Sequence, residues 1–211
     1  MKNLIICCEG VTEEVFVEKI LSPYLKQTGL YVTSKGMKGV SNYKRIKDFL
    51  VGYCQSYPTA LVTTMIDYYG AANHLPGFSS GEGDIYIHAK MIEAAVEKDL
   101  HWLHNFMFNL TLHEFEGYLF SNTADFNGIA SKSQLDELAD IRRRHETPEH
   151  INDQYETAPS RRILRIKPDY LKIQDGIEIA GRIGIDKIAA ECRHFANWLA
   201  KLTAWAKEGT E

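Results

Sequence analysis

A short apolar run near the amino terminus leads through a glycine into an amphipathic stretch, and this order restricts the possible folds strongly. The run Leu4–Cys8 is continuous, as in a strand that is buried on both faces of a sheet. From Val15 onward, apolar residues recur at helical spacing. Gly10 lies at the turn between them, and Thr12 is a suitable N-cap for the helix. A buried strand followed at once by a helix is typical of α/β proteins.

Strands and helices continue to alternate along the first half of the chain, and the second half has a helical pattern. The order strand, helix, strand implies right-handed βαβ units and a parallel sheet of about four strands flanked by helices. We predict a single domain over residues 1–211, with an α/β core at 1–122 and a helical C-terminal part at 123–211. A polar, glycine-rich loop is expected at Tyr69–Asp84. The predicted strands are Asn3–Cys8, Tyr31–Thr33, Ala60–Ile66 and Phe106–Leu112; the predicted helices are Glu13–Gln27, Tyr43–Tyr53, Tyr86–Lys98, His113–Phe120 and Lys132–Arg144, with short helices from Arg161, from Ile177 and from Asp186 to Lys207.

The composition predicts a packed, cytoplasmic protein. Hydrophobic residues make up 45% of the 211 residues and charged residues 25%, so a sizeable core is expected and global disorder is not. No apolar run approaches membrane-spanning length, and the amino terminus has no signal-peptide h-region. The four cysteines have no C-x-x-C spacing, which favours reduced core residues over zinc ligands or disulfides.

The charges are distributed unevenly along the chain. The net charge is −4, which does not indicate a surface that coats nucleic acid. Residues 1–130 carry 10 Lys and Arg against 14 Asp and Glu, whereas the segment Arg142–Lys172 carries eight basic and five acidic residues. An acidic first part with a local basic segment suits a metal site beside a phosphate track. A solvated helix face explains these counts equally well.

Acidic side chains follow three of the predicted strands. Glu9 ends the first strand, and Glu13 opens the helix that follows. Asp67 ends the strand that precedes a Tyr-Tyr-Gly turn. An Asx-turn, in which the side chain binds nearby backbone N–H groups, explains Asp67 as well as a functional role does. Glu13 and Glu14 could also complement the helix dipole, and for Glu14 we prefer that interpretation.

The third acidic group is His113-Glu114-Phe115-Glu116, which follows the alternating strand pattern at 106–112. If a helix begins at once, Glu114 and Glu116 diverge by roughly 200°, and His113 shares a face with Glu116. If the backbone stays extended, the two glutamates point the same way. His113 is either a metal ligand or proton carrier, or a helix-start residue bonded to nearby backbone.

Acids at the carboxyl ends of three parallel strands should meet at one edge of the sheet, where open α/β sheets bind ligands. Like charges in one crevice repel, so such a cluster needs a compensating cation or bound protons. Carboxylate oxygens suit Mg²⁺ or Mn²⁺, which bridge to substrate phosphates. The expected chemistry is metal-assisted phosphoryl transfer through Glu9, Asp67 and one of the acids at 114 and 116.

The motifs resemble those of a known family. The opening C-E-G-V-T-E-E and the strand-end I-D-Y-Y-G resemble the Toprim domain of topoisomerases, primases, recombination proteins and nucleases of the overcoming-lysogenization-defect type. More narrowly, T-M-I-D-Y-Y-G, H-E-F-E-G-Y-L-F, A-P-S-R-R and F-A-N-W-L look like a prokaryotic family of Toprim-like proteins of unknown function, found in some anti-phage defence systems. These blocks extend from Cys8 to Leu199.

The resemblance implies a Toprim-like, Rossmann-like sheet with Glu9 as the first-motif glutamate. It assigns Glu13 to a second metal and Asp67 to the first position of the D-x-D motif. Tyr69 occupies the place of the second aspartate, so Glu114 or Glu116 would supply the missing ligand.

A lysine of the C-terminal part assists the phosphate in such nucleases, and Lys172 is our assignment for it. The resulting catalytic set is Glu9, Asp67 and Lys172, and the metal set is Glu9, Glu13, Asp67, Glu114 and Glu116.

Three functions use these residues differently. The first is a Mg²⁺- or Mn²⁺-dependent nuclease acting on RNA or DNA, a defence or toxin effector controlled by a regulatory partner protein. The second is an inactive Toprim-like module that binds nucleic acid, a nucleotide or a partner protein, which Tyr69 favours. The third is a phosphotransferase or phosphohydrolase acting on small nucleotides.

Overall fold

The computed structural model describes residues 1–39, 42–79, 83–112, 114–151 and 155–208. It contains two compact units. The first comprises Met1–Leu112 with Ala200–Glu211, and the second comprises His113–Leu199. The single domain over residues 1–211, with an α/β core at 1–122 and a helical part at 123–211, stays a prediction.

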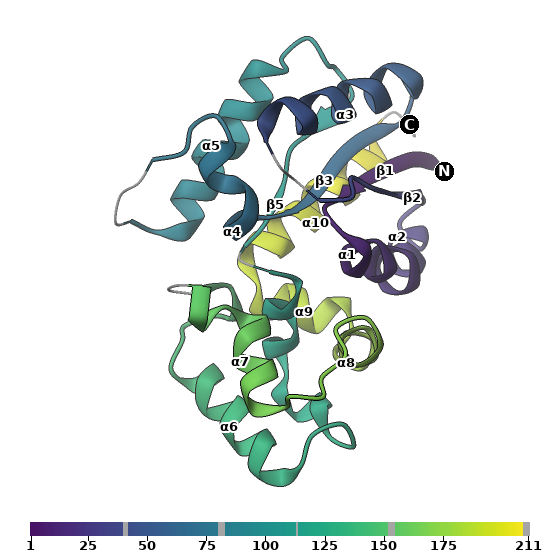
Figure 1. The fold of residues 1–211 in the computed structure, drawn as a ribbon. Helices are drawn as coiled ribbons and strands as arrows, with labels where there is room; N and C mark the ends of the chain where they lie inside the picture. Colours follow the sequence, from purple (N-terminus) through teal and green to yellow (C-terminus); the bar gives the residue numbers. More distant parts are fainter. Residues whose placement is uncertain (40–41, 80–82, 113, 152–154, 209–211) are drawn as a thin grey trace. The chain divides into compact units, whose positions relative to one another are not determined.

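A parallel sheet organises the first unit (Figure 1). Its strands follow the order β2-β1-β3-β4. The strand β5 pairs with the last two residues of β3, and β4 pairs with an earlier part of β3. Every pairing is parallel, which confirms the predicted α/β class with a sheet of about four strands. The strands are β1 (Lys2–Cys8), β2 (Leu30–Gly36), β3 (Leu61–Asp67), β4 (Phe106–Met107) and β5 (Leu110–Thr111).

The prediction of one continuous strand at 106–112 was wrong, because β4 and β5 are separated by two residues. The buried Thr64 side chain explains the break. Its Oγ1 accepts a hydrogen bond from the Asn109 N–H at 2.8 Å and donates to the Asn109 carbonyl at 2.7 Å. The hydroxyl therefore satisfies the backbone groups that a regular ladder would have paired.

The helices of the first unit largely follow the predicted pattern, with two differences at their starts. The first helix begins at Val11 and not at Glu13, because Gly10 is the N-cap in place of Thr12. The predicted loop at Tyr69–Asp84 begins instead with helical turns. The elements are α1 (Val11–Phe16), a π turn (Val17–Leu21), α2 (Ser22–Lys26), α3 (Tyr43–Ser56), α4 (Tyr68–Ala71), a 3₁₀ turn (Ala72–His74) and α5 (Ile85–Asp99).

The two faces of the sheet are covered by different helices. Ser34 on β2 donates a hydrogen bond to Glu18 of the π turn at 2.8 Å, so even-numbered residues of β2 face the first helix. Lys35 places its ammonium 6.0 Å from the centre of the Tyr53 ring, so odd-numbered residues face α3. Figure 1 shows α3 on the opposite side of β1 and β2 from α1 and α2.

The second unit is built from helices. The segment predicted as an α-helix from His113 is a 3₁₀ helix over the described residues Phe115–Ser121. The predicted helix from Asp186 to Lys207 is interrupted at Cys192. None of the helices within the described ranges is long and apolar enough to cross a membrane. The longer helices are α6 (Lys132–Arg143), α7 (Pro159–Ile166), α8 (Gln174–Ile183), α9 (Ile185–Glu191) and α10 (Arg193–Lys207), of which residues from Ala200 belong to the first unit.

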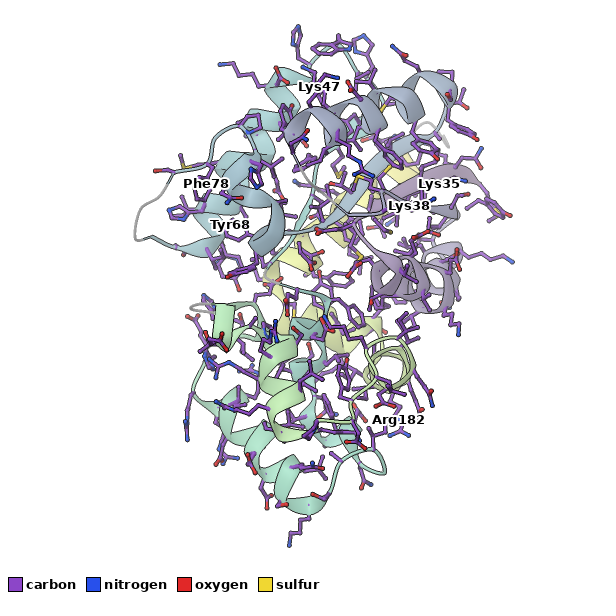
Figure 2. The ribbon with its side chains drawn as sticks, in the orientation of Figure 1. Lys35, Lys38, Lys47, Tyr68, Phe78 and Arg182 are labelled. Carbon is purple, nitrogen blue, oxygen red and sulfur yellow. The ribbon has the colours of Figure 1, made fainter. Side chains whose placement is uncertain are left out.

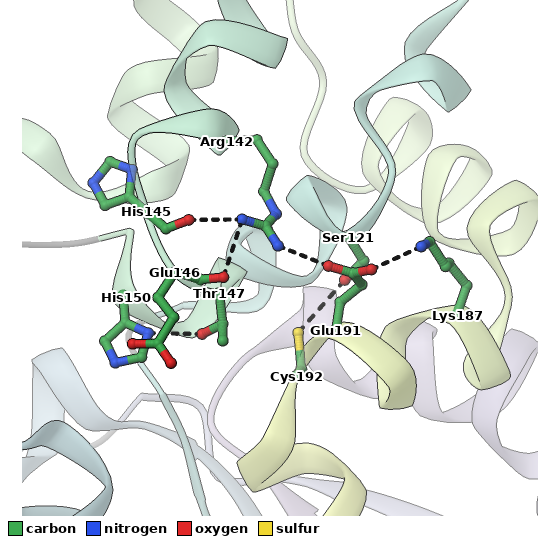
Figure 3. Close-up of polar contacts among 9 residues, drawn as sticks. All are labelled: Ser121, Arg142, His145, Glu146, Thr147, His150, Lys187, Glu191 and Cys192. Atoms are coloured by element: carbon green, nitrogen blue, oxygen red, sulfur yellow. Dashed lines mark hydrogen bonds and ion pairs between the residues drawn. The ribbon is translucent and has the colours of Figure 1, made fainter.

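Arg142 at the end of α6 is a structural residue of the second unit (Figure 3). Its guanidinium donates to the His145 carbonyl at 2.8 Å and to Glu191 at the end of α9 at 2.7 Å. Lys187 pairs with the other oxygen of Glu191 at 2.8 Å. Arg142, a member of the basic segment at 142–172, therefore forms hydrogen bonds within the second unit.

Candidate acidic site at the carboxyl ends of the strands

Glu9 directly follows β1 and reaches across to β3. Its backbone N–H donates to the Met65 carbonyl at 3.0 Å, and its own carbonyl accepts from the Gly39 N–H at 3.0 Å. Its side-chain Oε2 accepts a hydrogen bond from the Asp67 N–H at 3.1 Å. The Glu9 carboxylate is therefore held at the carboxyl end of β3.

Asp67 is the last residue of β3 and lies opposite Thr111 of β5. The structure thus brings the predicted Glu9 and Asp67 together at the sheet edge. The Thr111 hydroxyl beside them is fully buried and makes no hydrogen bond to any described residue. Buried hydroxyl groups almost always have a hydrogen-bond partner. The Thr111 hydroxyl is therefore available to bind a further polar group at this edge of the sheet.

Glu13 caps the start of the first helix. Its Oε2 accepts a hydrogen bond from the Gly10 N–H at 3.0 Å, and the side chain is 7% exposed. A Cβ at Gly10 would lie 3.1 Å from this oxygen, so the glycine leaves room for the carboxylate. The contact gives Glu13 a structural role, whereas its role toward a metal stays a prediction.

Tyr69, which replaces the second acid of the resembled motif, lies in the first turn of α4. Because α4 begins directly after Asp67, position 69 continues a helix and not the strand. The Tyr69 side chain is 43% exposed.

Lys38 lies next to the backbone of Glu9, and it was not among the residues predicted from the sequence. The N–H groups of its neighbours Met37 and Gly39 donate to the Cys8 and Glu9 carbonyls at 2.9 and 3.0 Å. Lys38 itself has a left-handed backbone (φ 56°) and an exposed side chain. The Gly-Met-Lys-Gly sequence at 36–39 is typical of a turn and could have indicated Lys38. It follows the strand predicted at Tyr31–Thr33 and was not considered part of the sheet edge.

The other predicted residues form a group of their own in the second unit. Glu114 accepts a hydrogen bond from the Ser160 N–H at the start of α7, at 3.0 Å. Glu116 is 2% exposed, and its Oε1 lies 3.1 Å from the Lys172 ammonium. His113 lies outside the described residues. The predicted part of Glu114, Glu116 and Lys172 in catalysis stays a prediction.

Burial raises the pKa of Glu116, and the nearby Lys172 opposes this effect. Tyr170 lies in the same surroundings, and burial together with the Glu116 charge raises its pKa. The Tyr170 hydroxyl makes no hydrogen bond within the described part of the chain. This corner of the second unit therefore holds a buried acid with one half-exposed counter-ion.

We expect the wild-type protein to lose stability relative to Glu116→Gln as the pH rises above the ordinary carboxyl pKa of 4.5. The folded-state pKa is higher than the unfolded-state pKa, so the folded protein binds this proton more tightly. That stabilisation is present below pH 4.5 and is lost as the pH rises through the folded-state pKa. Urea unfolding of both proteins across this range measures the difference.

Glu146→Gln, at an exposed position of the same unit, is the control and should track the wild type at every pH. Parallel stability curves for Glu116→Gln and the wild type would show that the pKa of Glu116 is not raised.

The donor set at the sheet edge fits Mg²⁺ or Mn²⁺ through a pair of carboxylates. Both ions prefer oxygen ligands, and Mg²⁺ is commonly held by one or two carboxylates together with waters and substrate phosphates. The Glu9 carboxylate lies at the Asp67 backbone N–H, so Glu9 and Asp67 are the candidates for such a pair. No group of three or more His, Cys, Asp or Glu side chains able to hold a metal occurs among the described residues. A closed cage of protein ligands is therefore not formed by this part of the chain.

Comparison with known proteins identifies the family. The family model described as "Domain of unknown function (DUF4276)" matches residues 8–203. The chain belongs to the DUF4276 family. The matched range of this DUF4276 protein includes Glu9, Asp67 and all the other predicted site residues. No curated protein matches the chain.

Two solved structures are similar to this DUF4276 chain over nearly its full length. The C-terminal region of the Burkholderia pseudomallei OLD protein is 17% identical, with a TM-score of 0.45. The alignment covers 96% of this chain and 97% of that one. The C-terminal region of the Xanthomonas campestris pv. campestris OLD protein is 16% identical, with a TM-score of 0.38 and coverage of 93% and 95%.

Proposed function

We propose that this protein is a Mg²⁺- or Mn²⁺-dependent nuclease of the Toprim type, which hydrolyses phosphodiester bonds in RNA or DNA. The observation that carries the proposal is the bond between the Glu9 carboxylate and the Asp67 N–H at 3.1 Å, which joins two acids at adjacent strand ends. The carboxyl edge of a parallel sheet is where this architecture binds ligands. A role as a cytoplasmic defence or toxin effector, restrained by a partner protein, belongs to the same proposal.

Each residue of the edge has a distinct task. Glu9 and Asp67 hold the divalent ion, and the ligand roles that the motif resemblance implies for Glu13, Glu114 and Glu116 stay predictions. When bound, the ion neutralises phosphate charge and activates a water molecule for attack. The exposed Lys38 ammonium binds a phosphate of the substrate beside Glu9, the task that the resemblance assigns to Lys172.

One feature favours a second candidate, a module that binds nucleic acid, a nucleotide or a partner without catalysis. Tyr69 stands where the motif has its second acid, and its place in α4 keeps it off the strand end. With fewer carboxylates, the ion would bind weakly or only together with substrate phosphates.

We expect Mn²⁺ to bind the purified protein saturably, and we expect Asp67→Asn to weaken this binding by at least about tenfold. The substitution removes one anionic ligand but keeps the shape of the side chain and the backbone N–H that Glu9 requires. Isothermal titration calorimetry measures both affinities.

Asp48→Asn is the matched control, because Asp48 is an exposed aspartate of α3 that pairs with Lys44. It should leave Mn²⁺ affinity unchanged. Mn²⁺ binding that does not respond to Asp67→Asn would exclude Asp67 as a ligand, and the non-catalytic module would become the better interpretation.

A further inference from the structure

We propose that the α3-facing side of β2 holds a nucleobase pocket, and that the substrate class of this protein is therefore single-stranded nucleic acid. The inference deepens the proposed nuclease function and rests on it only for the chemistry at Glu9 and Asp67. Binding of the base depends on a separate group of residues in the first unit, which line the pocket.

A pocket of about 190 Å³ opens between the edge strand β2 and the end of α3. Two of its walls are tyrosine rings that remain largely open to solvent, Tyr31 at 61% and Tyr57 at 47% exposure. Large aromatic side chains are usually covered, so two exposed rings at one pocket favour a flat, apolar ligand. The lining residues are Asn3, Leu4, Ile5, Tyr31, Thr33, Lys35, Tyr57 and Ala60.

Tyr57 is the end of an aromatic series along α3. Its ring lies nearly parallel to that of Tyr53, with 15° between the planes and 6.1 Å between the centroids. The Tyr53 ring in turn contacts Phe49 at 4.9 Å. Residues four apart on a helix lie on one face, so each ring holds the next in position. A base entering the pocket would continue this series by stacking on Tyr57, as bases stack on aromatic platforms in proteins that bind single strands.

The polar groups of the pocket suit a base and its phosphate. The Asn3 amide both donates and accepts hydrogen bonds, the Thr33 hydroxyl does the same, and the Lys35 ammonium offers a positive charge. The Glu18 carboxylate lies on the other face of β2, where it accepts a hydrogen bond from Ser34. The pocket face of β2 presents the Lys35 ammonium, and this positive charge complements an anionic backbone.

The register of the sheet separates the pocket from the acids by a defined length. Tyr31 pairs with Asn3, and Lys35 pairs with Cys7 two residues before Glu9. At about 3.3 Å per residue, Tyr31 lies about 20 Å along the strand direction from Glu9. A single nucleotide cannot place its base in the pocket and its phosphate at Glu9. A strand of several nucleotides can, and Lys35 and Lys38 lie along that path (Figure 2).

The test is binding of fluorescent oligonucleotides in EDTA, measured by anisotropy, since hydrolysis cannot occur without metal. The probes are a single-stranded RNA, the same sequence as single-stranded DNA, the duplex, and a labelled mononucleotide. We expect at least one single strand to bind more tightly than the duplex and the mononucleotide. Tyr31→Ala and Tyr57→Ala should each weaken that binding at least about fivefold, as the loss of a stacked base does.

Two variants separate stacking from folding and from general surface effects. Tyr57→Phe keeps the ring and should bind like the wild type, even if Tyr57→Ala reduces stability. Trp102→Ala removes a ring of similar exposure (45%) from the same unit and should leave affinity unchanged. Equal binding by the wild type and both tyrosine-to-alanine variants would overturn the pocket. Mononucleotide binding as tight as oligonucleotide binding would overturn the polymer substrate.

The two proposals fail in different ways in this experiment. Binding that depends on Tyr31 and Tyr57, combined with no cleavage after Mn²⁺ is added, would support the pocket and contradict the nuclease. Cleavage that does not respond to either tyrosine variant would contradict the pocket and leave the nuclease supported.

Discussion

Glu9→Gln is expected to reduce metal-dependent phosphodiester hydrolysis by at least about 10³-fold while the protein remains folded. Removal of a single group that stabilises charge in a transition state costs about 10²–10³-fold, and loss of a metal ligand adds to this. The amide oxygen of glutamine can still accept the Asp67 N–H hydrogen bond, which is 3.1 Å long in the wild type. The sheet edge therefore keeps its shape and loses its charge. Cleavage of a labelled oligonucleotide in Mn²⁺, with thermal unfolding measured in parallel, provides both quantities.

The matched control is Glu18→Gln, a glutamate nine positions further along the chain whose bond to Ser34 lies on the sheet face away from the pocket. It should cleave at the wild-type rate. If Glu9→Gln cleaved as fast as the wild type, Glu9 would have no part in the chemistry, and the proposed site would have to be abandoned.

The fold could be predicted from the sequence where local pattern and burial agree. The continuous apolar runs before Glu9 and Asp67 are centrally placed strands, paired on both sides, as such runs require. Because all strands are parallel, residues after their carboxyl ends meet at one edge, and so the proximity of Glu9 and Asp67 followed from topology alone. The strand β2 was underestimated, since a partly exposed edge strand has little apolar pattern.

The features that could not be predicted depend on contacts between residues far apart in the chain. The Thr64 hydroxyl replaces ladder bonds of Asn109, 45 positions away, and nothing local marks that exchange. Lys38 is placed beside Glu9 by two backbone bonds that exist only once β2 is paired with β1. Glu116 could not be assigned a direction, because its segment forms a 3₁₀ helix, the geometry that neither sequence alternative considered.

Glu149 is a further long-range contact of this kind, and its replacement should have the largest effect on stability in the second unit. Glu149 is 2% exposed, and its two carboxylate oxygens accept hydrogen bonds from the N–H groups of His194 and Phe195 at 2.9 and 3.0 Å. These N–H groups belong to the first turn of α10 and have no partner within the helix. The carboxylate satisfies both of them and complements the helix dipole.

We therefore expect Glu149→Ala to lower the free energy of unfolding by about 3 kcal/mol, because it leaves two buried donors without an acceptor. Amide hydrogen exchange at His194 and Phe195 should accelerate, and thermal unfolding should occur at a lower temperature. Glu149→Gln should recover only part of the loss, since its NH₂ group cannot accept the second N–H. Glu146→Ala removes an exposed glutamate three positions earlier and is the control, with an expected change within about 0.5 kcal/mol. If Glu149→Ala were as stable as that control, the carboxylate would not be needed to hold the start of α10.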